Sequence, residues 1–61
     1  MYLITRFELA SKSDSELAAL YRETFNALAR SARESAERRN ALASLENIEA
    51  ERAARLLQPN G

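Results

Sequence analysis

Ser31-Ala32-Arg33-Glu34-Ser35 is a polar stretch between two segments that each carry apolar residues at helical spacing. One unbroken helix is sterically possible here, because neither Gly nor Pro occurs between residues 2 and 58. Its apolar seam would then have to contain Ser31, Glu34, Ser35 and Arg38, and buried polar groups without partners are costly. We therefore predict a turn at residues 31–35. Either Ser31 with Glu34, or Ser35 alone, can cap the helix that follows.

Both segments beside the turn are predicted to be helices. Ser13-Asp14-Ser15-Glu16 has the pattern of a capping box, which begins a helix over residues 14–30. A second helix is expected over residues 36–57, where Ala, Arg, Glu and Leu predominate. Pro59 favours non-helical dihedral angles at the residue before it, so residues 58–61 are expected to be a frayed tail. Because the connection is short, we expect the two helices to be antiparallel neighbours.

The N-terminal residues are compatible with either a helix or a strand. Tyr, Ile, Thr and Phe within residues 1–10 suit a strand, whereas Thr5 and Glu8 have the spacing of a capping box. Ile4 and Leu9 are placed as a hydrophobic staple around that box, which favours a short helix over about residues 6–11. The strand remains an open alternative from the sequence.

The composition excludes several kinds of chemistry. The chain has 61 residues with no Cys and no His, which rules out disulfides, Cys/His zinc sites, and catalysis by either residue. Nine basic and nine acidic residues leave no net charge to attract nucleic acid or an acidic membrane. Apolar runs such as Tyr2-Leu3-Ile4 are too short to cross a bilayer. We expect a cytoplasmic protein without membrane contact, cofactor or metal.

A chain of this size can build only a thin core from these elements. The predicted fold class is all-α, with residues 1–57 forming a single domain. It is a helical hairpin with a short N-terminal helix, and we expect it to dimerise into a helical bundle. The face expected to mediate self-association consists of the apolar residues that recur along both long helices. These are Leu17, Leu20, Tyr21, Leu28, Leu42, Leu45, Ile48 and Leu56. The expected function is a non-enzymatic protein–protein association module, either regulatory or accessory.

Four arginines close to the turn indicate an alternative function. They are Arg30, Arg33, Arg38 and Arg39. A hairpin would gather them at one end, where they could contact an anionic partner such as a nucleic acid. Glu34 and Glu37 lie in the same stretch and oppose such binding, and no aromatic residue is interleaved for base stacking. A nucleic-acid-binding regulator is therefore the alternative to the association module.

Charged residues of the second helix allow further interpretations. Arg52 lies in the middle of the apolar stripe, where it could form an interhelical or intersubunit salt bridge, or pack its stem while the guanidinium reaches water. Glu46, Glu49 and Glu51 could hold a cation or act as an acid/base pair. We favour a solvated face with pairs such as Glu51 and Arg55, because no other side chain completes a site. No catalytic residue is predicted.

Three strings, residues 3–10, 20–23 and 35–48, resemble those of a group of short uncharacterised bacterial helical proteins. The resemblance covers most of the chain but implies no activity. Members of that group more often have Pro, Asn or Gly at the positions of Arg33 and Glu34, which fits a turn there. In architecture alone, the predicted hairpin is also similar to short plasmid proteins that dimerise into four-helix bundles, with which it shares no motif.

Overall fold

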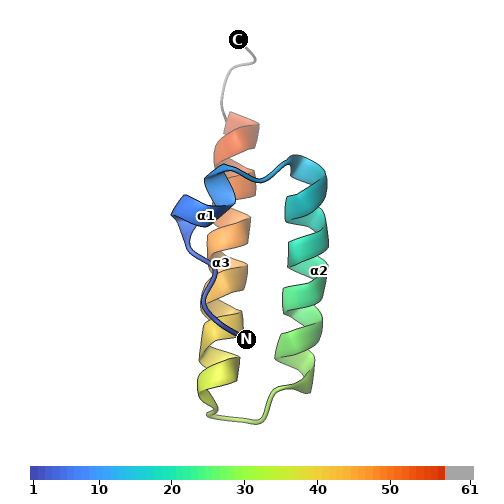
Figure 1. Ribbon diagram of the computed structural model, residues 1–61, viewed down its shortest axis with the longest axis vertical. Coiled ribbons are helices and arrows are strands. Elements are labelled where there is room, and N and C mark those ends of the chain that lie inside the picture. Colours follow the sequence, from blue (N-terminus) through green and yellow to red (C-terminus); the bar gives the residue numbers. More distant parts are fainter. Residues whose placement is uncertain (58–61) are drawn as a thin grey trace.

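A computed structural model of the protein describes residues 1–57. It contains three helices: α1 (Arg6–Ala10), α2 (Asp14–Arg30) and α3 (Ala36–Leu57). These residues contain no strand, so the predicted all-α class is confirmed. Figure 1 shows that α2 and α3 lie side by side and run in opposite directions, with α1 against α3. The predicted tail at residues 58–61 lies outside the described residues.

The turn between α2 and α3 combines two serine caps with one left-handed residue. Ser31 ends α2, and its hydroxyl donates to the carbonyl of Leu28 at 2.7 Å. Ser35 caps α3, because its hydroxyl accepts from the N–H of Arg38 at 3.0 Å. Between them, Glu34 has a φ of 62°, the only positive φ of a non-glycine residue within residues 1–57. The chain therefore leaves the helical path here, and Ser35 is the cap of α3.

Replacing Glu34 by glycine is expected to stabilise the fold. A left-handed conformation costs a residue with a Cβ about 1–2 kcal/mol, which glycine avoids at some cost in chain entropy. We expect Glu34→Gly to raise the free energy of unfolding by about 0.5–1 kcal/mol in urea titrations followed by circular dichroism. Arg33→Gly is the matched control, because Arg33 has a negative φ and should lose stability. Equal effects of the two substitutions would contradict this account of the turn.

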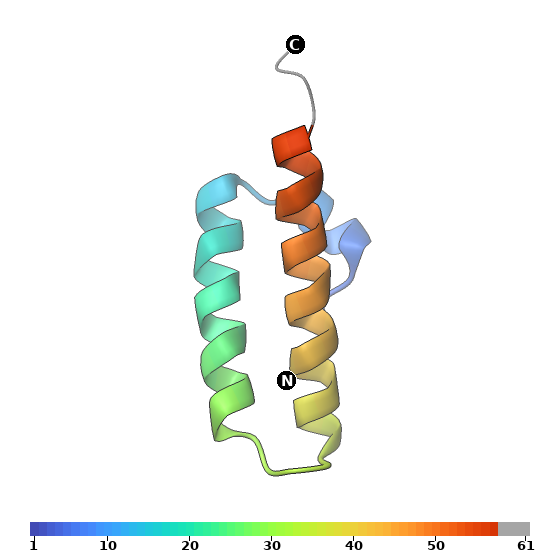
Figure 2. The same cartoon turned by 180° about the vertical axis from the view of Figure 1, so that it is seen from behind.

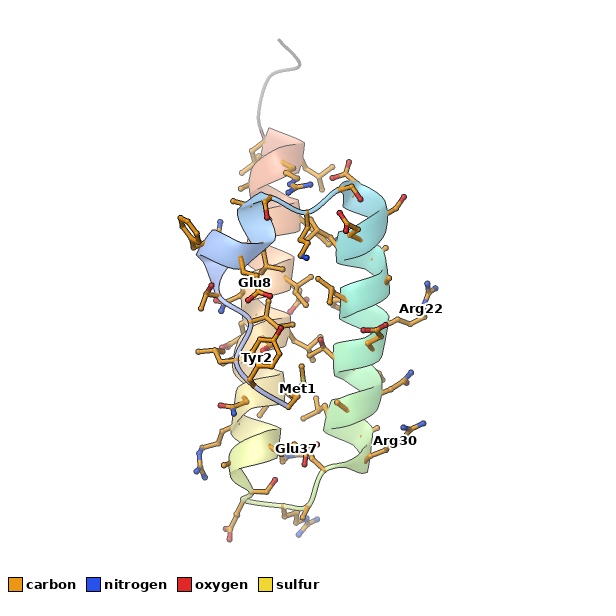
Figure 3. The ribbon with its side chains drawn as sticks, viewed as in Figure 1. Met1, Tyr2, Glu8, Arg22, Arg30 and Glu37 are labelled. Carbon is orange, nitrogen blue, oxygen red and sulfur yellow. The ribbon has the colours of Figure 1, made fainter. Side chains whose placement is uncertain are left out.

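Side-chain caps also fix the beginnings of α1 and α2. The Thr5 hydroxyl accepts from the N–H of Glu8 at 3.2 Å. The Glu8 carboxylate accepts from the Tyr2 hydroxyl at 3.2 Å, and Figure 3 shows the two side chains next to each other. The capping box at Ser13 and Glu16 is complete, with bonds of 3.1 and 2.8 Å. Its bond from the Ser13 backbone lowers the pKa of Glu16 below the ordinary value. These caps explain why α1 and α2 begin where the sequence predicts.

The N-terminal segment, residues 1–5, lies along α3 and is held there by three polar side chains. Asn40 donates its amide N–H to the carbonyl of Met1 at 3.0 Å, and Asn47 donates to the carbonyl of Ile4 at 2.8 Å. The N–H of Ile4 donates to the buried Ser44 hydroxyl at 2.9 Å. These bonds satisfy backbone groups that have no helical partner. The segment therefore becomes a fixed part of the fold.

The core lies where this segment, α1 and the two long helices meet. Its buried cluster consists of Ile4, Leu9, Leu17 and Ile48, with Leu20 and Tyr21 packed against it. Burial of one such aliphatic side chain contributes about 1.5–3 kcal/mol. Leu9 is completely buried, whereas Phe7, two residues earlier, is 91% exposed. Only one of the two apolar residues that we expected α1 to contribute therefore enters the core.

Arg55 ties the end of α3 to the chain between α1 and α2. Its guanidinium donates to the carbonyls of Leu9 at 3.2 Å and Lys12 at 2.6 Å. The same group pairs with Asp14 at 2.8 Å and with Glu51 at 3.0 Å. The bond from Arg55 lowers the pKa of Glu51 below its ordinary value. One side chain thus fixes α1, the start of α2 and the last turns of α3 relative to one another.

Candidate association surface

The N-terminal segment covers one side of the α2–α3 pair and leaves the opposite side open. Asn40, Ser44 and Asn47 mark the covered side of α3, because they bind the segment. Figure 2, which views the molecule from behind, shows α2 and α3 unobstructed, with α1 and the N-terminal end beyond them. We call this uncovered side of the pair the open face.

Phe25 and Leu42 are the large apolar residues of the open face. Each residue of an α-helix turns by about 100°, so Leu42 lies about 160° around α3 from Ser44. By the same geometry, Phe25 lies about 140° around α2 from Leu20, which packs against the core cluster. Phe25 is 53% exposed and Leu42 is 44% exposed. By the same geometry the open face also includes Ala18 and Ala29 of α2 and Glu46, Glu49 and Ala53 of α3, with Arg22 at its outer edge, where Figure 3 shows the side chain pointing away from α3.

Arg52 lies between the two helices near this face. Its guanidinium carbon is 5.8 Å from the centre of the Tyr21 ring, within the range of a cation–π interaction. Within residues 1–57 it forms no ion pair, neither with Glu49 nor with an acid of α2. Arg52 is an exposed residue, and the interhelical salt bridge that the sequence allowed is not formed within residues 1–57.

The predicted self-association face requires a correction. Leu17 and Ile48 are completely buried and Leu45 is 8% exposed, so they are not available to a second molecule. Ile4 and Leu9 cover part of this stripe, which the sequence left without a partner. The other predicted members are more accessible. Leu20, Tyr21 and Leu28 are half-buried, Leu42 is exposed, and Leu56 is 86% exposed.

The turn places the four arginines proposed as an anionic-partner contact at one end of the helix pair, but not all of them are free. Arg38 donates to the carbonyl of Leu28 at 3.4 Å, and Arg39 donates to the carbonyl of Glu34 at 3.3 Å. Arg30 extends away from the helix pair (Figure 3), and Arg33 is exposed in the turn. Two of the four guanidinium groups are thus engaged in stabilising the turn.

The carboxylates of α3 form no metal site. Glu51 pairs with Arg55 at 3.0 Å and with Arg6 at 3.4 Å, whereas Glu46 and Glu49 are exposed. Across residues 1–57, no three acidic side chains come together as cation ligands would. In the same part of the chain, no helix has the length and apolar character needed to span a membrane.

The open face contains residues that were not predicted from the sequence to mediate association, chiefly Phe25, Arg22 and Glu46. A second stripe was nevertheless present in the sequence. On α2 it runs through residues 18, 22, 25 and 29, and on α3 through residues 42, 46, 49 and 53, with identical spacing. This second stripe was not recognised because it consists mostly of Ala and charged residues, whereas periodicity is read mainly from large apolar residues.

Comparisons with known proteins add no relative. No protein-family model matches this chain, and no similar protein is found among curated proteins or among solved structures.

Proposed function

We propose that the protein is a small non-enzymatic association module, regulatory or accessory in role, that dimerises with a second copy of itself through the open face. The exposure of Phe25 and Leu42 on a side of the helix pair that nothing in residues 1–57 covers carries this proposal. Large apolar residues gathered on one exposed face are typical of association sites, whereas single scattered ones are not.

The small size of the core supports the same proposal. Only six apolar residues within residues 1–57 are buried, and one of them is an alanine. Domains of about this length usually gain stability from a disulfide, a metal or self-association. Without Cys or His the chain can form neither a disulfide nor a Cys/His metal site. Two helix pairs packed open face to open face would surround a shared apolar layer with four long helices.

The proposal is tested by two substitutions that remove the same atoms from different sides of the molecule. Phe25→Ser alters the open face, and Phe7→Ser alters an even more exposed residue of α1. In light scattering at micromolar concentration, the wild type and Phe7→Ser should have twice the 6.9 kDa chain mass, whereas Phe25→Ser should have the mass of one chain. A wild-type protein that remains monomeric, or a Phe25→Ser variant that dimerises as well as Phe7→Ser, would overturn it.

We do not propose nucleic-acid binding, because Arg38 and Arg39 are engaged with backbone carbonyls of the turn. Glu34 and Glu37 also lower the positive potential at that end of the molecule. Charge reversal at Arg33 should therefore leave the dissociation constant of the dimer unchanged.

A further inference from the structure

We propose that the two copies pack with α2 of each against α3 of the other, around a two-fold axis parallel to the helices. This inference rests on the proposed dimer and adds its orientation and register. It comes from three charged residues of the open face: Arg22 on α2, and Glu46 and Glu49 on α3. All three are exposed, and none forms an ion pair or side-chain hydrogen bond within residues 1–57.

The ion pair between Asp14 and Arg55 sets the relative height of the two helices. Arg22 lies eight residues after Asp14, and Glu46 and Glu49 lie nine and six residues before Arg55. Heights along the helices can be measured from the level of the Asp14–Arg55 pair at 1.5 Å per residue. On this scale Arg22 lies at about 12 Å, between Glu49 at about 9 Å and Glu46 at about 14 Å. The basic and acidic positions are therefore level with each other.

A two-fold axis parallel to the helices preserves these heights and exchanges the two helices. Arg22 of one copy then lies between Glu46 and Glu49 of the second copy, and the same contact is repeated by symmetry. Phe25, about 17 Å from the level of that ion pair, lies close in height to the exposed Leu42 of the second copy, at about 20 Å. Charged and apolar positions thus find complementary partners in a single arrangement.

The other face-to-face arrangement places α2 on α2 and α3 on α3. Arg22 would then face α2 of the second copy, on which Glu16 and Glu23 lie about 180° and 160° around the helix from Phe25. The remaining acid near Phe25, Asp14, is already paired with Arg55. The acidic edge of α3 would lie over the acidic edge of the second copy, which is unfavourable. The charge pattern therefore favours the arrangement that exchanges the helices.

Charge reversal tests the register. Arg22→Glu and Glu46→Arg should each weaken the dimer at least about tenfold at low salt, because each reversal creates two symmetry-related like-charge contacts. The double variant Arg22→Glu/Glu46→Arg should recover part of the lost affinity, because positions 22 and 46 again carry opposite charges while Glu49 still opposes the new acidic side chain. Arg33→Glu and Glu23→Arg are the controls, since they change net charge equally but lie outside the open face.

Sedimentation equilibrium of the wild type and the five variants gives the dissociation constant of each dimer, and the pattern tests the register separately from the dimer itself. If the wild type dimerises but the single reversals at Arg22 and Glu46 match the controls, the register is wrong and the dimer stands. Single reversals that weaken the dimer without recovery in the double variant also overturn the direct pairing. A monomeric wild type overturns both the register and the proposed function.

Discussion

Leu9→Ala is expected to lower the free energy of unfolding by about 3 kcal/mol, a large share of the stability that a domain of this size possesses. Leu9 is completely buried between α3 and the start of α2, and alanine would leave a cavity there. We expect a substantial unfolded fraction at 37 °C, measured by urea titration and thermal melting at one fixed protein concentration.

Phe7→Ala is the matched control for this substitution. It removes a larger side chain from the same five-residue helix, but Phe7 is 91% exposed. Its effect on the free energy of unfolding should be within about 0.5 kcal/mol. Similar losses in the two variants would mean that α1 does not pack as the structure describes.

Ser44→Ala is expected to lower the free energy of unfolding by about 2 kcal/mol, because it leaves the N–H of Ile4 buried without an acceptor. Thr24→Val provides the contrast. Thr24 is 1% exposed, and its hydroxyl has no hydrogen-bond partner among the described residues. Removing that hydroxyl at constant shape should raise stability by about 1 kcal/mol.

In urea titrations, the free energy of unfolding should therefore fall in Ser44→Ala and rise in Thr24→Val. Both residues are hydroxyl-bearing and buried in the long helices, so a general intolerance of change in the core would destabilise both variants. Loss of stability in Thr24→Val would contradict the assignment of an unpaired hydroxyl, and a neutral Ser44→Ala would contradict the attachment of the N-terminal segment to α3.

The helices were predictable because their signals are local. The Ser13 capping box fixes the start of α2. The end of α2 at Arg30 was expected because a polar stretch follows it. Both predicted ranges of the long helices, 14–30 and 36–57, coincide with α2 and α3. The short helix ends one residue earlier than expected, at Ala10, which is within the ordinary uncertainty of helix ends.

The packing of the N-terminal segment was not predictable in the same way. In a helix of five residues, periodicity alone cannot decide which apolar side chain faces inward, and only the staple pattern of Ile4 and Leu9 distinguished Leu9 from Phe7. The polar residues that bind the segment, Asn40, Ser44 and Asn47, are forty or so positions from their partners. Arg55 likewise binds groups more than forty residues away. Only the tertiary structure brings such groups together.

The same limit explains the error in the predicted association face. The sequence contains one dominant apolar stripe on each long helix, and the N-terminal segment was expected to add to a thin core without a defined place on that stripe. Once Ile4 and Leu9 lie on that stripe, Leu17 and Ile48 become part of the core. The second stripe, with Phe25 and Leu42, is then the surface that remains for a partner.

Sedimentation equilibrium of the wild-type chain over a wide range of concentration tests the central claim most directly. The open face predicts an apparent mass that rises from 6.9 kDa towards twice that value as concentration increases. A single species of 6.9 kDa at every concentration, with full helical circular dichroism, would contradict it.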